Sequence, residues 1–504
     1  MPKSKVLKSL LTVTGFSVLT RSLAFLFKIY LSRTLGAETL GLYQMALTVF
    51  FLFIALSTGG ISTVLSRKIA EMNATLTGDK GLKQLSSALF LGVGTSLICL
   101  LVAYLSLPYM GFIITDERAI PLLKIMLPAL ISTTFYIIIR GWFWGNKYFL
   151  DFSLSEFIEE ILRIILTILF ISGIISGING EVGVAVAFLI SDVVVMVVVI
   201  ITFLRRGGKF TLEGSNVLGL KAMVKPALPL TLMKIFGSFA GTAIALIIPA
   251  GLVRGGMSIG EATASVGRIA GMANPLIFAP NAIISALNIV LVPEMSESNA
   301  KGDLNALKNQ ISTGITTSLV ISGGFMLVYL ALGKELTSFL YGDLPSGLYL
   351  EKASLLLLLA PINHTLASTM NSIGKEKENF ITYSFGSILM LIASIVLPKY
   401  VGIESVIVAD LMFSLTVVIG NSYYLRKHVS GSLGILKPLF SVIVLALSCS
   451  LLAHFLNGIL VKVNVVLALL SGSIISFILY FLLAYFFKVA DLKLLYRKKN
   501  GTTT

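Results

Sequence analysis

The chain has 504 residues, of which 56% are hydrophobic and only 12% are charged, and its mean hydropathy is +0.94. Soluble globular domains carry about 25% charged residues, so this composition excludes a soluble enzyme and predicts an all-α polytopic membrane protein surrounded by membrane lipids. The net charge of +15 comes from basic residues scattered over short loops. Such scatter is typical of topology signals and not of a nucleic-acid surface, so we expect no nucleic-acid partner.

Apolar segments bounded by loop signals predict about fourteen transmembrane helices. We expect them near residues 7–34, 40–66, 84–107, 119–140, 152–175, 182–204, 226–250, 262–292, 306–332, 352–371, 380–398, 403–425, 438–458 and 464–487. An even number puts both termini on the same side of the membrane. Basic clusters such as Arg67-Lys68, Arg205-Arg206 and Arg426-Lys427 then share one side, which the positive-inside rule identifies as the cytoplasm.

A weak internal repeat predicts two lobes of six helices each. A shift of 226 residues places Gly41 on Gly267 and Glu71 on Glu297, and a shift of 218 places Asp192 on Asp410. Two halves of six helices share their orientation, so their pseudo-twofold axis should run along the membrane normal. We expect an N-lobe at 1–204, a basic cytoplasmic linker at 205–225, a C-lobe at 226–428, appended helices thirteen and fourteen at 429–488, and a basic cytoplasmic tail at 489–504.

Motifs for catalysis and for cofactor binding are missing from the sequence. It contains no GxxxxGK[ST] phosphate loop, no HExxH, no GxSxG and no paired zinc ligands. Cys99 and Cys449 lie alone in apolar runs, which is typical of packing residues. We therefore expect no enzyme, no cofactor and no metal site.

Basic residues inside the predicted helices are the strongest functional signal. Arg21 and Lys28 are seven residues apart on one face of the first helix, and Lys234 and Arg268 lie within the seventh and eighth helices. A charge inside the bilayer costs roughly 3 to 17 kcal/mol, so such residues usually line a water-filled cavity or pair with one another. Four cations over both halves favour an anion-binding cavity, and snorkelling or internal salt bridges are the alternative.

Acidic residues and prolines inside the predicted helices form a second set. Arg163 follows Glu159 and Glu160 at helical spacing, which predicts a structural ion pair. Asp192 and Asp410 lie deep in apolar segments, where either a coupling-ion site or structural packing is expected. Helix breaks that free backbone carbonyls are expected at four prolines, Pro226, Pro229, Pro275 and Pro280.

Several segments resemble the stage V sporulation protein B family. The first is Thr20-Arg21-Ser22-Leu23-Ala24-Phe25 with Leu35-Gly36-Ala37 and Gly41-Leu42-Tyr43. The second is Arg140-Gly141-Trp142-Phe143-Trp144-Gly145, followed by Ser155-Glu156, Glu160 and Arg163. The third is Leu291-Val292-Pro293-Glu294-Met295-Ser296-Glu297. Together they span much of the chain.

That family belongs to the multidrug/oligosaccharidyl-lipid/polysaccharide exporter superfamily, together with the lipid II flippases. The resemblance implies two six-helix lobes around a cationic cavity, alternating access, and a lipid-linked sugar diphosphate as cargo. Arg21 and Arg268 match the positions of cavity arginines in the first and eighth helices of the lipid II flippases. Where those relatives carry a further arginine late in the first helix, this chain has Phe27 beside Lys28. The resemblance also implies a groove for the lipid tail at the last two helices.

The sequence therefore predicts a flippase in the bacterial cytoplasmic membrane that translocates an undecaprenyl-diphosphate cell-wall precursor, with lipid II and a role in sporulation among the options. Cell-wall synthesis enzymes are further expected partners. One alternative is a cation-coupled multidrug exporter, although such pumps usually need a carboxylate where this chain has Arg21 and Lys28. The other alternative is a non-transporting scaffold for wall synthesis, which would not need buried cations in both halves.

Overall fold

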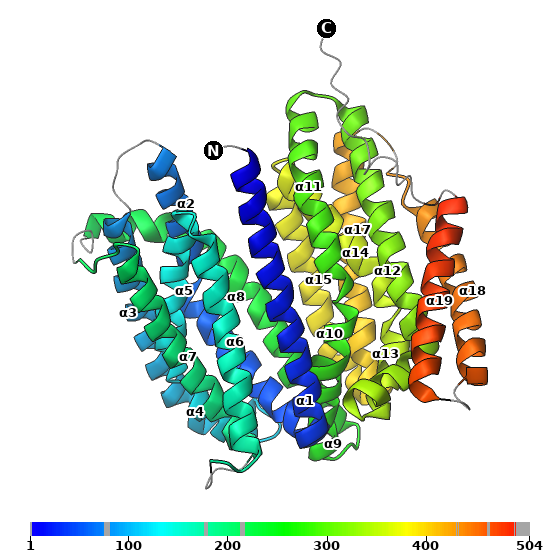
Figure 1. The fold of residues 1–504 in the computed structure, drawn as a ribbon, viewed down its shortest axis with the longest axis horizontal. Helices are drawn as coiled ribbons and strands as arrows, with labels where there is room; N and C mark the ends of the chain where they lie inside the picture. The colour runs from blue at the N-terminus through cyan, green and yellow to red at the C-terminus, as the bar shows by residue number, and fades with distance from the viewer. Residues whose placement is uncertain are drawn as a thin grey trace. The chain divides into compact units, whose positions relative to one another are not determined.

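The computed structural model describes residues 3–74, 81–175, 180–211, 217–429, 431, 433–460, 464–487 and 489, and its regular elements in these residues are all helices (Figure 1). The contacts divide the chain into two compact units, Met1–Val253 with Met257–Gly267, and Arg254–Gly256 with Arg268–Thr504. This division by contacts falls near the end of α8 (Val217–Arg254) and not within the predicted linker 205–225. The predicted lobes depend on the sequence repeat and stay a prediction.

Besides α8, the described residues of the first unit form eight α-helices and one 3-10 helix. They are α1 (Lys3–Thr58), α2 (Ile61–Ala74), α3 (Leu82–Ser106), η1 (Leu107–Phe112), α4 (Ala119–Met126), α5 (Ala129–Gly145), α6 (Phe149–Ile171), α7 (Gly180–Arg205) and α9 (Ile259–Val266). A bend of 49° separates α4 from α5 at Pro128. The predicted segment 119–140 therefore consists of two helices that meet at a bend, because proline lacks the N–H that would continue the helix.

Helix α1 contains the first predicted membrane segment and most of the second. Gly36 has φ 79° and ψ 175°, so the chain kinks there and resumes the helix at once. A side chain would be strained at this φ, which explains why a glycine occupies the kink. The second predicted segment, 40–66, is itself interrupted, because α1 ends at Thr58 and α2 begins after Gly59-Gly60.

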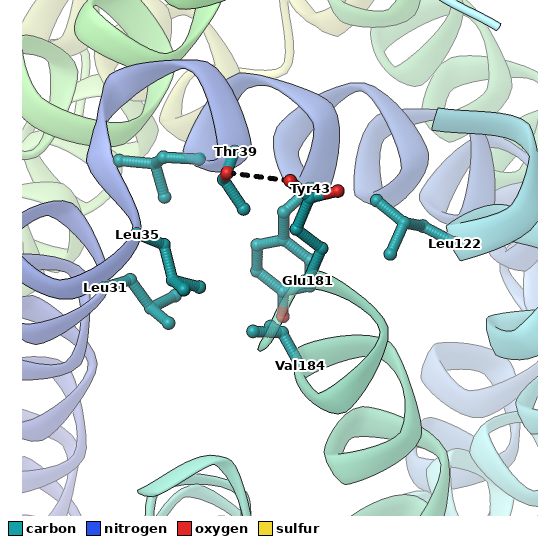
Figure 2. A pocket seen from close by; sticks show the side chains of 8 residues that line it. Leu31, Leu35, Thr39, Tyr43, Leu122, Glu181 and Val184 are labelled. Carbon is teal, nitrogen blue, oxygen red and sulfur yellow. Dashed lines mark hydrogen bonds between the residues drawn. The ribbon is translucent and has the colours of Figure 1, made fainter. Parts of the chain in front are cut away.

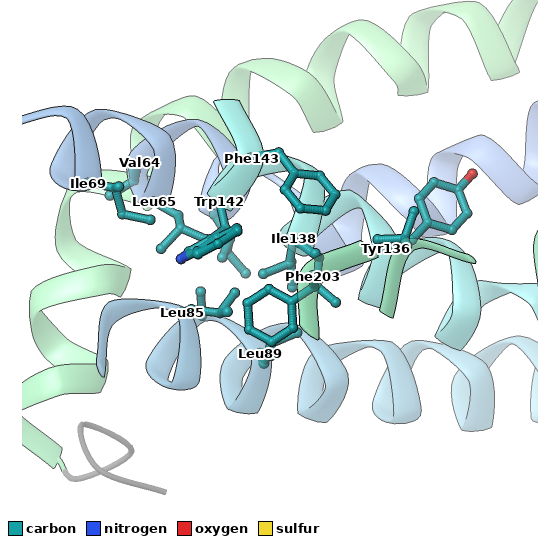
Figure 3. Packing of buried hydrophobic residues seen from close by; sticks show 14 of the residues in the cluster. Val64, Leu65, Ile69, Leu85, Leu89, Tyr136, Ile138, Trp142, Phe143 and Phe203 are labelled. Atoms are coloured by element: carbon teal, nitrogen blue, oxygen red, sulfur yellow. The ribbon is translucent and has the colours of Figure 1, made fainter. Parts of the chain in front are cut away.

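A buried cluster joins α2, α3, α5 and α7 (Figure 3). Trp142 is fully buried at its centre, and its ring packs edge to face on Phe203 with centroids 4.9 Å apart. Most residues of α5 are buried, and Trp144 near the end of the helix is exposed.

Helices α1 and α9 approach so closely that two glycines are required. A methyl group at Gly41 would overlap the carbonyl oxygen of Thr263, and one at Gly267 would overlap the carbonyl oxygen of Ala37. The shift of 226 residues that relates Gly41 to Gly267 also relates Ala37 to Thr263. The contact thus has the reciprocal form that a local twofold axis produces.

The loop before α4 stabilises the contact between α1 and α9 through a hydrogen bond to Thr263. Asp116 accepts hydrogen bonds from Arg118 Nε at 2.9 Å and from Thr263 Oγ1 at 2.8 Å, and its side chain is only 3% exposed. Burial by itself would raise the pKa of the Asp116 carboxyl, but these hydrogen bonds outweigh burial and keep that pKa below its ordinary value.

The second unit contains the rest of the broken eighth helix and the helices that follow it. They are η2 (Gly267–Ala273), which is π-helical, α10 (Asn274–Ile277), α11 (Pro280–Ala300), α12 (Leu304–Tyr341), α13 (Leu344–Ala353), α14 (Leu356–Ser372), α15 (Glu376–Val396), α16 (Pro398–Val401), η3 (Gly402–Glu404), α17 (Ser405–Val429), α18 (Leu436–Leu460) and α19 (Val465–Phe486). The last two helices pack on each other and on α12, where Phe477 contacts Phe325 with ring centroids 6.0 Å apart. Residues 490–504 of the predicted basic tail lie outside the described residues.

Eight helices in the described part of the chain are long and apolar enough to cross a membrane, and up to eleven if each of three bent pairs counts as one span. Helix α6 is not among them, because it carries five charged residues: Asp151, Glu156, Glu159, Glu160 and Arg163. The helical membrane fold is as predicted, and the number of fourteen spans stays a prediction.

Candidate functional site

A network of charged side chains joins α5, α6 and α7 inside the first unit. Arg163 is at its centre: its Nη2 lies 2.7 Å from Glu159 Oε1 and 3.3 Å from Asp192 Oδ1, and its Nη1 lies 3.1 Å from Glu160 Oε2. The side chains of Arg163, Glu159 and Glu160 are each 14% exposed or less. The ion pair expected from the spacing is therefore present, and it extends to a third helix through Asp192.

Arg140 on α5 is a member of this network that the search for charges inside spans missed. Its Nη2 lies 2.6 Å from Glu159 Oε2, its Nε donates to Ser155 Oγ at 3.2 Å, and its guanidinium lies 4.3 Å from the ring centre of Tyr136. The resemblance did include Arg140 in a motif. Arg140 lies at the end of a predicted span, 19 residues before Glu159, so the helical spacing that identifies ion pairs within one helix does not apply to this pair.

Asp192 belongs to the network and not to an isolated site. Its side chain is 1% exposed, and it accepts a hydrogen bond from the Thr133 hydroxyl in addition to the Arg163 contact. The sequence left open a coupling-ion role or structural packing for Asp192. The observed partners are those of a structural carboxylate, and a coupling role stays a prediction.

The two cations of α1 face the carboxylates of α6. The network holds two arginines, Arg140 and Arg163, against four acids, Glu156, Glu159, Glu160 and Asp192. Arg21 interacts electrostatically with Glu156, and Lys28 with Glu160. The Arg21 side chain is nevertheless exposed, and Lys28 is half-buried. The α1 cations thus complete the charge balance of the network and, at Arg21, remain accessible to a further anion.

Lys234 on α8 has a different environment from Arg21. Its Nζ donates to the Gly59 carbonyl oxygen at 2.8 Å, and the neighbouring Thr231 hydroxyl accepts from the Gly60 N–H at 2.8 Å. Both side chains therefore satisfy backbone groups that the break between α1 and α2 leaves without helical partners. A role of Lys234 in anion binding stays a prediction.

Arg268 in the second unit is paired. Its Nε lies 3.2 and 3.1 Å from the two carboxylate oxygens of Asp343, and the two side chains are 14% and 16% exposed. Asp343 also caps α13 by accepting from the Ser346 N–H at 2.8 Å. The sequence search did not find Asp343, because it lies 75 residues from its partner in a loop.

Asp410 on α17 interacts electrostatically with Tyr349 on α13. The Tyr349 hydroxyl is buried and has no hydrogen-bond partner among the described residues. Among the described residues no arginine pairs with Asp410 as Arg163 does with Asp192, so the two aspartates that the repeat relates are not equivalent in their partners. A coupling role of Asp410 stays a prediction.

The four prolines expected to break helices divide into two pairs. Pro275 and Pro280 lie at a real break, where the segments Ile259–Ile277 and Pro280–Ala300 meet at 45°. At Pro226 and Pro229 the backbone of α8 is helical through both positions, so the helix has no break there, and the freeing of backbone carbonyls by these prolines stays a prediction.

A small pocket beside the α1 kink carries little chemistry (Figure 2). Leu31, Leu35, Leu122 and Val184 line it together with Tyr43, and the Thr39 hydroxyl donates to Glu181 Oε1 at 3.2 Å. In the described residues, no group of His, Cys, Asp and Glu side chains is arranged to bind a metal ion. The polar chemistry of the first unit is therefore that of the α5–α6–α7 network and the α1 cations.

Comparisons with known proteins agree with this fold. A family model described as polysaccharide biosynthesis protein matches residues 6–299, more than half of the chain. The stage V sporulation protein B of Bacillus subtilis (strain 168) is 23% identical over 369 residues, which is 71% of this chain and 71% of that protein. The lipid II flippase MurJ of the same organism is 23% identical over 503 residues, covering 91% of this chain and 88% of the flippase.

A solved structure is similar over almost the whole length. It is a lipid II flippase MurJ in an inward closed conformation, and it matches with a TM-score of 0.71 at 18% identity, covering 96% of this chain and 99% of that chain. At this identity the match establishes the fold alone.

Proposed function

This chain belongs to the polysaccharide biosynthesis protein family, and we propose that it is a flippase for a lipid-linked oligosaccharide. The cargo is an undecaprenyl-diphosphate cell-wall precursor of the lipid II type, and it crosses the cytoplasmic membrane by alternating access without covalent chemistry. The observation that carries the proposal is the similarity to a lipid II flippase over 88% of that protein's length. The chain is a multi-pass membrane protein, as its apolar helices and its relatives require.

The chemistry of α1 supports an anionic cargo. Arg21 is an exposed cation between Thr20 and Ser22 in a largely apolar helix, and its guanidinium can bind a diphosphate through two parallel hydrogen bonds. The polyprenyl tail of such a cargo remains in the lipid, so only the head group requires a polar path. A multidrug exporter that exchanges its substrate for cations would need a carboxylate on α1 at this place.

Transport by the purified protein is the direct test. We expect liposomes that contain the protein to expose a fluorescent lipid-linked disaccharide to an external quencher much faster than empty liposomes do. A matched lipid phosphate without the sugar diphosphate controls for nonspecific lipid scrambling. Equal rates with and without the protein, in liposomes that contain folded protein, would contradict the proposed function.

We propose further that both termini face the cytoplasm, on the basis of the basic clusters that share one predicted side. Single cysteines at Pro345 and Lys147, both exposed, test this in a background without Cys99 and Cys449. A thiol reagent that cannot cross the membrane should label position 345 in intact cells and leave position 147 unlabelled. The reverse pattern would overturn the orientation.

A further inference from the structure

A second pocket with polar and apolar lining residues lies between α2, α5 and α6 in the first unit, with a volume of about 410 Å³. This volume is within the range of roughly 300–1,000 Å³ that small-molecule sites occupy. The hydroxyl-bearing residues Ser62, Thr63 and Ser66 line it from α2, Arg140 lines it from α5 and Glu156 from α6. We call this space the α5 pocket.

The charged pair in the α5 pocket keeps hydrogen-bonding capacity for a ligand. Arg140 Nη1 and Glu156 Oε1 are 3.6 Å apart, which is an ion pair but too long for a hydrogen bond. Arg140 Nη2 lies 2.6 Å from Glu159 Oε2, and this ion pair holds the guanidinium in its orientation toward the pocket. Glu156 is 39% exposed, while Arg140 is 9% exposed. The pocket thus offers one donor and one acceptor that are oriented in advance.

An aromatic side chain at the edge of the α5 pocket is fixed as well. Trp144 is 42% exposed, and its ring packs edge to face on Phe149 and Phe152, with centroids 5.2 and 5.0 Å apart. Trp142, two residues earlier, belongs to the buried cluster, and the helix turn directs Trp144 to a different side of α5. The negative face of an indole ring suits the weakly positive C–H groups of a sugar ring.

The charged side chains that line the α5 pocket are balanced, because Arg140 and Glu156 carry one charge each, and Glu159, the other partner of Arg140, is also paired with Arg163. This lining offers a diphosphate no excess of positive charge. An uncharged polyhydroxylated ring fits better, because hydroxyls can donate to Glu156 and accept from Arg140 at the same time. Glu156 also interacts with Arg21 on α1, so the pocket is next to the cation that the proposed function assigns to the diphosphate.

We propose that the α5 pocket binds a sugar unit of the cargo, with Trp144 as its stacking platform and Arg140 and Glu156 as its hydrogen-bonding pair. This rests on the proposed function, because the diphosphate on Arg21 brings the first sugar to the pocket. The α5 pocket then determines the specificity for the sugar, while Arg21 attracts the diphosphate.

Two probes separate the sugar from the diphosphate. One is a short-chain prenyl diphosphate that carries N-acetylglucosamine, and the other is the same prenyl diphosphate without the sugar. We expect the full-length protein in nanodiscs to bind the sugar-bearing probe about tenfold more tightly. Trp144→Ala should remove this difference and leave the affinity for the sugarless probe unchanged, and Trp144→Phe should keep most of it.

Controls make each outcome decisive. Phe112→Ala truncates an aromatic side chain that is 91% exposed on η1, away from the residues that line the pocket, and should keep the sugar preference. The chain has only two tryptophans, and Trp142 is buried, so a sugar-dependent fluorescence change should disappear in Trp144→Phe. Equal binding of both probes by the natural protein, or a preference that survives Trp144→Ala, would refute the sugar site and leave the flippase proposal standing. Failure of both probes to bind would count against the flippase proposal itself.

Discussion

Arg21→Ala is expected to abolish most transport while the protein remains in the membrane at its normal level. An arginine that binds a diphosphate through charge-assisted hydrogen bonds contributes about 1.5–3 kcal/mol, which corresponds to roughly ten- to a hundredfold in transport. Arg21 is exposed and its removal creates no cavity, so the fold should tolerate alanine. Complementation of a flippase-deficient strain, with membrane levels measured for each variant, is the measurement.

Two comparisons separate the geometry of Arg21 from its charge. Arg21→Lys keeps the charge but loses the two parallel hydrogen bonds, so its activity should lie between those of the natural protein and of Arg21→Ala. Arg67→Ala removes one positive charge from an exposed pair on α2, where Arg67 and Glu71 are 61% and 67% exposed, and it should remain active. Full activity of Arg21→Ala at a normal level would show that α1 does not bind the cargo's anion.

The second predicted cavity arginine needs a different design, because the structure gives it a partner. Arg268→Ala leaves Asp343 without its ion pair in a partly buried position, so a loss of activity could arise from instability alone. In Arg268→Ala with Asp343→Asn, no unpaired charge remains, and Asn still caps α13. An inactive double variant at a normal level therefore supports a role for Arg268 in transport.

The sequence predicted the helical segments well where the apolar run and the helix coincide. Segments 84–107, 182–204 and 438–458 agree closely with α3, α7 and α18. The differences occur at helix breaks inside apolar runs, at Gly59-Gly60 and at Pro128, because hydropathy does not distinguish a bent span from a straight one. Both breaks have a sequence signal, a glycine pair and a proline, that a search for breakers would have found.

The candidate site shows which interactions spacing can predict. Glu159 and Arg163 are one helical turn apart, so their ion pair follows from the sequence alone. Arg140 with Glu159, Arg163 with Asp192 and Arg268 with Asp343 are separated by 19, 29 and 75 residues. These contacts depend on which helices are neighbours and on how each is rotated, and both are decided by packing such as that of Trp142 on Phe203.

Arg163→Ala is expected to act on stability and not on cargo binding. Arg163 lies between Glu159, Glu160 and Asp192, so its loss leaves three buried carboxylates with one remaining arginine, Arg140, near them. Removal of one partner of a buried ion pair costs about 3–5 kcal/mol. Proteins are stable by only about 5–15 kcal/mol, so the abundance of the variant in membranes should fall several-fold.

The loss should be specific to the buried network and should be relieved by reducing its charge. Arg67→Ala is the matched control, since exposed pairs contribute about 0–1 kcal/mol and its abundance should be unchanged. Adding Asp192→Asn to Arg163→Ala removes one of the unpaired carboxylates but keeps a side chain to which Thr133 can donate, so abundance should partly recover. Membrane levels and the thermal unfolding midpoint of the purified variants measure both effects. A normal level of Arg163→Ala together with lost transport would instead assign Arg163 to the transport step, because a residue needed only for packing cannot be removed without loss of stability.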